Sequence, residues 1–189
     1  MRGRSSTVEA LGSSTQVDAG SNPVGSTISA TRSDAEKRAE QTRIASGYQG
    51  DVEERRQRRD GVVVTPVEVV DFQIRSAIHS LKEQFGRAPD EGVNWLDPFG
   101  GTGIYTARLL QIVDLPPSRK RQLAENCVVI EIDPTVAQVC ANNLAKVYRE
   151  ETGEAGAVRV ICADTFSLPP EVDLWDESLR VVFPEECCL

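Results

Sequence analysis

From residue 61 onward, apolar residues recur with the periods of strands and helices. Three short apolar runs have the length of buried strands: residues 93–96, 127–133 and 157–164. Between them, apolar residues recur at helical spacing after Gly103 and from Pro134 to about Gly153. Strands that alternate with helices predict parallel β-α-β units in an α/β sheet. The terminal "LRVVFPEECCL" predicts a fourth strand with an acidic tail.

A further helix is predicted ahead of the first strand, in "TPVEVVDFQIRSAIHSLKEQFG". Thr65 is placed as its N-cap and Pro66 in its first turn, with Glu68 three residues after the threonine. Gly86 ends it. Five apolar residues suggest one buried face: Val69, Phe72, Ala77, Ile78 and Leu81.

The first 60 residues differ in composition from the rest. Residues 1–33 are rich in Ser, Thr and Gly, which predicts disorder because such a segment buries little apolar surface. Residues 34–60 are charged with a thin apolar stripe, which indicates a connector able to form broken helix. Residues 61–189 are then one domain.

Charge and cysteine content narrow the class of protein. Residues 61–189 carry 11 Lys/Arg against 20 Asp/Glu, so this part is not a self-sufficient DNA-binding surface. No run reaches the roughly 18 apolar residues of a membrane span, and the polar N-terminus does not resemble a signal peptide. Five cysteines without C-x-x-C spacing and one histidine predict no metal site. We therefore expect a cytoplasmic protein without a membrane partner.

Candidate chemistry begins at "DPFGGTG", where Gly100, Gly101 and Gly103 join a strand to a helix. Glycines in such a loop let backbone approach a ligand closely, although a plain connection is the alternative. The loop lacks the Gly-Lys-Ser/Thr ending of a phosphate loop and the G-x-G-x-x-G dinucleotide fingerprint. Asp97 at the strand end suits a ligand with an ammonium group or hydroxyls.

Each of the three predicted strands has an acid at its C-terminal end: Asp97, Glu131 and Asp164. Asp133 is better explained as a helix cap before Pro134. Ligands of such sheets bind at the carboxyl ends of the strands, and an acid after the second strand can accept ribose hydroxyls. The pattern therefore predicts an adenosine with a positively charged or zwitterionic tail.

These residues resemble the S-adenosylmethionine-dependent amino-methyltransferases that modify adenine in DNA. "DPFGGTG", "VVIEIDP" and "CADTF" are similar to three motifs of that family, and "GVVVTPVEVVDF" to the motif that precedes them. The order is most like the methyltransferase segment of single-chain restriction-modification proteins. The resemblance covers about residues 61–168 and implies a Rossmann-like parallel sheet of the class I methyltransferase type, incomplete at its C-terminal side.

The resemblance also implies roles for individual residues. Thr65 and Pro66 would line the methionine end of the cofactor, Ile132 the adenine ring, and Asp164 the adenine amino group, with Thr165 or Phe166 beside the ring. The full implied cofactor set is Thr65, Pro66, Asp97, Pro98, Gly100, Gly101, Gly103, Glu131, Ile132, Asp164 and Thr165.

The chain departs from the family in one motif, Asn or Asp followed by two prolines and an aromatic residue. The two Pro-Pro pairs, in "DLPPS" and "SLPPE", have leucine before them and no aromatic residue after them. We therefore expect no catalytic residue in this chain, and DNA contact through a missing or separate recognition domain. The chain is then either truncated or completed by a partner chain.

Two other functions are compatible with the sequence. One is a noncatalytic assembly or binding module with the methyltransferase fold in a restriction or anti-restriction complex. The other is a small-molecule or protein methyltransferase with an unusual acceptor motif, because the fold does not determine the acceptor.

Overall fold

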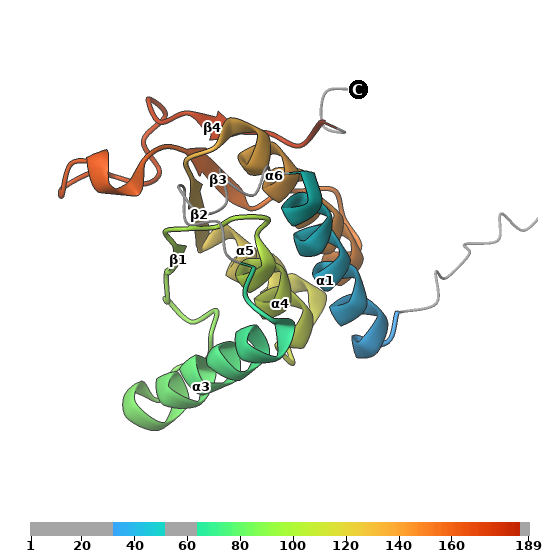
Figure 1. The fold of residues 1–189 in the computed structure, drawn as a ribbon. Coiled ribbons are helices and arrows are strands. Elements are labelled where there is room, and N and C mark those ends of the chain that lie inside the picture. Colours follow the sequence, from blue (N-terminus) through green and yellow to red (C-terminus); the bar gives the residue numbers. More distant parts are fainter. Residues whose placement is uncertain (1–31, 52–63, 186–189) are drawn as a thin grey trace, which may run out of the picture. The chain divides into compact units, whose positions relative to one another are not determined.

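The computed structural model describes residues 32–51 and 64–185 (Figure 1). No helix in these two ranges is long and apolar enough to cross a membrane. The elements, in chain order, are α1 (Asp34–Asp51), α3 (Val67–Phe85), β1 (Trp95–Asp97), α4 (Ile104–Ile112), α5 (Pro117–Glu125), β2 (Cys127–Glu131), α6 (Pro134–Thr152), β3 (Arg159–Cys162), the 3-10 turn η1 (Thr165–Ser167) and β4 (Val181–Val182).

The strands form one open sheet in the order β1-β2-β3-β4. β1 pairs with β2 and β2 with β3 in parallel, so that Leu96 lies opposite Val128 and Val129 opposite Val160. This confirms the α/β class and the Rossmann-like arrangement of strands and helices. β4 is antiparallel to β3, a direction that the alternation of strands and helices did not predict. In the described part of the chain, β1 is paired on one side only.

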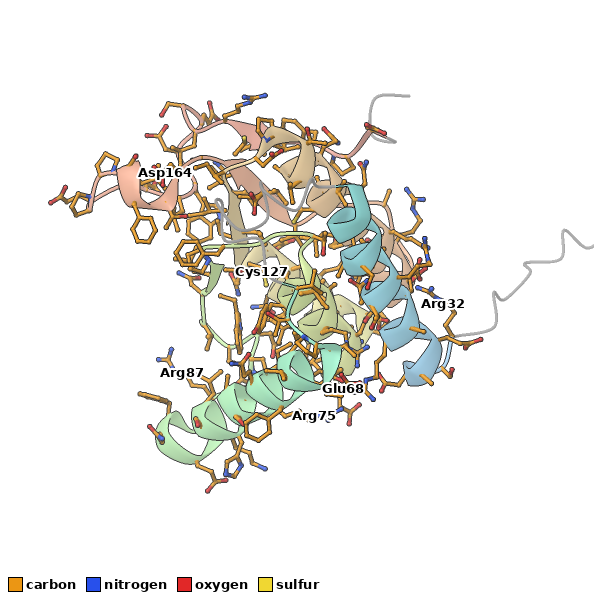
Figure 2. The ribbon with its side chains drawn as sticks, viewed as in Figure 1. Arg32, Glu68, Arg75, Arg87, Cys127 and Asp164 are labelled. Atoms are coloured by element: carbon orange, nitrogen blue, oxygen red, sulfur yellow. The ribbon has the colours of Figure 1, made fainter. Side chains whose placement is uncertain are left out.

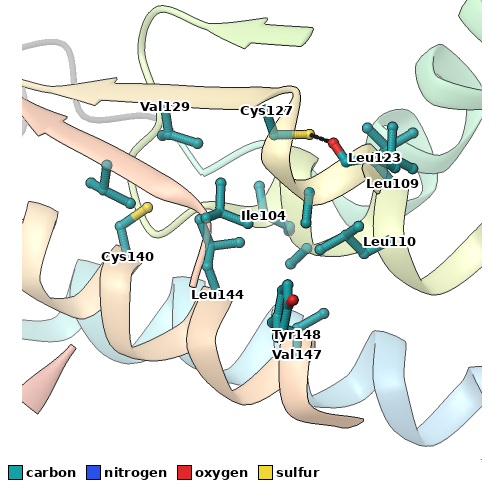
Figure 3. Packing of buried hydrophobic residues seen from close by; sticks show 14 of the residues in the cluster. Ile104, Leu109, Leu110, Leu123, Cys127, Val129, Cys140, Leu144, Val147 and Tyr148 are labelled. Carbon is teal, nitrogen blue, oxygen red and sulfur yellow. Dashed lines mark hydrogen bonds between the residues drawn. The ribbon is translucent and has the colours of Figure 1, made fainter. Parts of the chain in front are cut away.

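Successive strand residues point to opposite sides of the sheet, and the central strands bury residues on both sides. Val129 and Val160 belong to a core shared with α3, α4, α5 and α6. Figure 3 shows Leu110 of α4 and Val147 of α6 among the buried side chains of this core. On the other face, Val128, Ile130 and Ile161 pack against apolar residues of the segment after β3.

The predicted ends of α3 were right at the C-terminus and wrong at the N-terminus. Gly86 ends the helix in the left-handed region with φ 61°, where a residue without Cβ is favoured. The N-cap is Pro66, and no side chain caps the first turn, so Thr65 is not the cap. The Pro66 carbonyl instead accepts hydrogen bonds from the N–H groups of Val69 and Val70.

The buried face of α3 differs from the predicted one. Val69 and Phe72 are 42% and 70% exposed, whereas Val70 and Ile74 are almost fully buried. Ala77, Ile78 and Leu81 are half-buried. The buried face of α3 is the one that packs against α4. Because Val69 and Val70 are adjacent, the sequence did not reveal which of the two valines faces the core.

Two helices were not apparent as such in the sequence. α5 has mostly polar residues and buries only Lys120, Leu123 and Ala124. α1 occupies most of the expected connector as one continuous helix of 18 residues. It packs against α3 and α4 and is joined to α6 by hydrogen bonds. The rest of that segment, 52–60, and residues 1–31 of the expected disordered segment lie outside the described residues.

Candidate functional site

An acid and an exposed apolar side chain stand at the carboxyl end of each parallel strand. Asp97 and Glu131 end β1 and β2, and Asp164 follows β3. The exposed apolar side chains that follow these acids are Phe99 (64%), Ile132 (64%) and Phe166 (85%). Figure 2 shows Asp164 at this edge, well away from Arg87 after α3. The sequence prediction that three acids share one edge of the sheet is confirmed.

Glu131 fastens the glycine loop to the second strand. Its Oε2 accepts a hydrogen bond from the Gly101 N–H at 2.9 Å, and its Oε1 accepts one from the Asp133 N–H at 2.9 Å. The Gly100 N–H donates to the Ile130 carbonyl at 2.9 Å. A carboxylate has about four lone-pair sites, so Glu131 keeps acceptor capacity for further donors.

The three loop glycines meet different surroundings. A Cβ on Gly100 would lie 2.1 Å from Val129 Cγ1, and one on Gly103, at φ 80°, would lie 2.8 Å from Cys140 Sγ. A Cβ on Gly101, at φ 52°, would meet nothing within 4 Å. Packing on β2 and α6 therefore accounts for two of the glycines, and only Gly101 faces open space. Their contact with a cofactor stays a prediction.

Asp97 is the unusual member of the three acids. Its Oδ1 accepts a hydrogen bond from the Phe99 N–H at 3.3 Å, and its buried Oδ2 has no partner among the described residues. Burial raises the pKa of the Asp97 carboxyl; the Phe99 N–H lowers it, and the charge of Glu131 raises it. Asp97 also lines a cavity of about 410 Å³ between α3, β1 and α4. A buried oxygen without a partner costs free energy, which a ligand donor would recover.

We expect Asp97 to make folding stability depend on pH. Its folded pKa lies above the ordinary 3.8, so its contribution is fully present below pH 3.8 and is lost as pH rises through the folded pKa. Asp97→Asn lacks this titration. The melting temperature of the variant minus that of the wild type is expected to increase from pH 4 to pH 7 in thermal melts. A constant difference would contradict the elevated pKa.

The segment after β3 is joined to the segment after β1. The Thr165 hydroxyl donates to the Pro98 carbonyl at 2.6 Å. The rings of Phe99 and Phe166 lie with their centroids 5.5 Å apart. Asp164 caps η1, accepting from the Phe166 N–H at 3.0 Å and the Ser167 hydroxyl at 2.6 Å. Both oxygens of Asp164 thus accept hydrogen bonds from within the chain.

The remaining predicted site residues are less closely connected to the strand ends. Thr65 is half-buried and Pro66 is exposed at the start of α3. Among the described residues, neither forms a hydrogen bond with Asp97 or Glu131. Their cofactor roles, like those of the whole predicted set, stay predictions. Phe99 was not in that set, because its sequence position does not reveal that its ring is exposed beside Phe166.

The fold is an open α/β sheet, and the three acids lie at the carboxyl ends of its parallel strands. Ligands of such sheets generally bind at that edge. No family model matches the chain, and the search of curated proteins found no match. Similar solved structures include the DrdV–DNA complex, with a TM-score of 0.60 and 23% identity over 71% of this chain. Two Type ISP restriction-modification enzymes are also similar in fold. LlaBIII bound to DNA has a TM-score of 0.59 and 23% identity over 75% of this chain.

The second of these enzymes is a nuclease-deletion mutant of LlaGI in complex with a DNA substrate mimic. It has a TM-score of 0.52 and 30% identity over 61% of this chain. The match spans only 13% of the DrdV chain and 10% of each of the other two. The chain is thus similar to a small segment of much larger proteins.

Proposed function

We propose that residues 64–185 form the S-adenosylmethionine-binding part of a restriction-modification protein that methylates adenine in DNA. The observation that carries the proposal is the repeated pair at the strand ends, an acid followed by an exposed apolar side chain. The fold similarity to segments of two restriction-modification enzymes supports it.

The residues at this edge fit the chemistry of that cofactor. The partnerless Asp97 Oδ2 is an acceptor for the cationic ammonium group, and the free lone pairs of Glu131 are acceptors for ribose hydroxyls. Ile132 and the Phe99–Phe166 pair supply apolar surface for an aromatic ring. When bound, the cofactor would supply an activated methyl group.

The acceptor side of the reaction belongs to another segment or another chain. The Pro116-Pro117 pair begins α5, and Pro169-Pro170 follows η1, so the first pair has a structural role at a helix start. We infer that the unpaired side of β1, beside the 410 Å³ cavity, receives the missing strands with the catalytic motif. Alone, this chain would bind cofactor without transferring a methyl group.

A second candidate is a noncatalytic assembly module without cofactor. It is favoured by one specific observation, that both oxygens of Asp164 and both of Glu131 already accept hydrogen bonds within the chain. Acids with these hydrogen bonds can have a purely structural role. The two candidates differ in one measurable property, cofactor affinity.

Titration calorimetry of the purified chain with S-adenosylmethionine tests the proposal. Wild type is expected to bind saturably, and Asp97→Asn and Glu131→Gln to bind roughly tenfold or more weakly, because each loses a charged hydrogen bond. Asp114→Asn is the matched control, since Asp114 is an exposed acid between α4 and α5. A folded wild-type chain that gives no binding heat would favour the noncatalytic module.

A further inference from the structure

A buried pair of amide side chains joins α1 to α6. Gln41 of α1 is 1% exposed and Asn143 of α6 is 5% exposed. Gln41 Nε2 donates to Asn143 Oδ1 at 2.9 Å, and Asn143 Nδ2 donates back to Gln41 Oε1 at 2.9 Å. Buried amides without partners are costly, so this reciprocal pair holds both side chains in place.

The pair continues into the glycine loop. Asn143 Nδ2 also donates to the carbonyl of Thr102 at 2.9 Å, and Thr102 is itself buried. Two amides alone would pair equally well if both were turned over. The carbonyl is only an acceptor, so it selects the orientation in which the Asn143 NH₂ group faces the loop. Both N–H groups of that NH₂ are then used.

We propose that Asn143, braced by Gln41, is a positioning residue that holds the glycine loop in its ligand-binding conformation. This inference rests on the proposed function, because the ligand is the cofactor proposed above. Thr102 lies between Gly101, whose N–H is bound to Glu131, and Gly103, whose N–H donates to the Gly100 carbonyl at 2.8 Å.

The glycine loop has conformational freedom that a positioning contact would restrict. Gly101 and Gly103, on either side of Thr102, both have positive φ. Because glycine has more accessible backbone conformations than other residues, the peptide groups around Thr102 can change direction easily. The hydrogen bond from Asn143 fixes the direction of the Thr102 carbonyl from the interior, while Glu131 fixes the Gly101 N–H from β2. Helix α1 thereby contributes to the position of the glycine loop through Asn143.

The experiment measures two quantities in the full chain and its variants: the amide hydrogen exchange of residues 100–103 and the affinity for S-adenosylmethionine. Asn143→Leu has similar volume and lacks the amide. Its loop amides are expected to exchange about tenfold faster, and its affinity for S-adenosylmethionine to fall about tenfold, because the loop opens locally. Gln41→Met keeps the hydrogen bond from Asn143 to the Thr102 carbonyl but removes the amide that pairs with Asn143. Its effects should therefore be smaller and in the same direction.

Thr152→Val is the matched control, because Thr152 is also buried on α6 and its hydroxyl donates to the Tyr148 carbonyl at 2.8 Å. It should lower stability but leave loop exchange and affinity unchanged.

If Asn143→Leu and Gln41→Met change both readouts no more than Thr152→Val, the inference is wrong. If Asn143→Leu does not fold, Gln41→Met decides. If wild type binds no cofactor, the proposed function fails, and hydrogen exchange in the free chain still decides whether Asn143 positions the loop.

Discussion

Arg108→Met is expected to lower the free energy of unfolding by roughly 3–5 kcal/mol. The Arg108 side chain is fully buried. It donates two hydrogen bonds to Asp71 of α3, at 2.7 and 3.0 Å, and one to Asp34 of α1 at 2.7 Å. Methionine keeps much of the volume but leaves the buried Asp71 carboxylate without its main partner. Urea unfolding measures the loss.

Arg121→Met is the matched control for this prediction. Arg121 pairs with Glu154 at 2.5 Å, but both side chains are partly exposed, and such pairs contribute about 0–1 kcal/mol. Adding Asp71→Leu to Arg108→Met removes the uncompensated charge and should recover part of the stability. Equal losses for Arg108→Met and Arg121→Met would contradict a stabilising role for the hydrogen bonds from Arg108 of α4 to Asp71 of α3 and Asp34 of α1.

Gly103→Ala is expected to destabilise the fold by roughly 2–5 kcal/mol. About 1–2 kcal/mol comes from placing a Cβ in the left-handed region at φ 80°, and about 1–3 kcal/mol from overpacking. The new Cβ would lie 2.8 Å from Cys140 Sγ and 3.1 Å from Leu144 Cγ, both on α6. Thermal or urea unfolding measures the effect.

Gly101→Ala separates the two causes. Gly101 also has positive φ, 52°, but a Cβ there meets nothing within 4 Å, so only the conformational cost of about 1–2 kcal/mol applies. A loss as large as that of Gly103→Ala would contradict the close packing of the loop against α6.

The elements predicted correctly depend on local signals. The three parallel strands and α6 follow from apolar periodicity, and the Asp133 cap of α6 is confirmed by hydrogen bonds from the Thr135 and Val136 N–H groups. The predicted strands were longer than the observed ones by one to four residues, because apolar residues continue beyond the paired part. Periodicity marks burial, whereas strand bounds depend on pairing with neighbours.

The features that were not predicted depend on contacts distant in sequence. α1 is anchored through polar side chains such as Gln41, so its thin apolar stripe did not reveal how it packs. The buried face of α3 depends on α4, and the direction of β4 on its pairing with β3. At the site, the sequence placed the acids correctly. The partnerless oxygen of Asp97 and the cap formed by Asp164 depend on the folded geometry.

The amide pair between α1 and α6 also bears on the order of folding during synthesis. Gln41 and Asn143 are 102 residues apart in the chain. At about 5–20 residues per second, the ribosome adds Asn143 roughly 5–20 s after Gln41. Throughout that interval the Gln41 amide lacks its native partner. Helix α1 is therefore the first described element to be synthesised, and its contacts with α3 and α4 can form before its amide contact with α6.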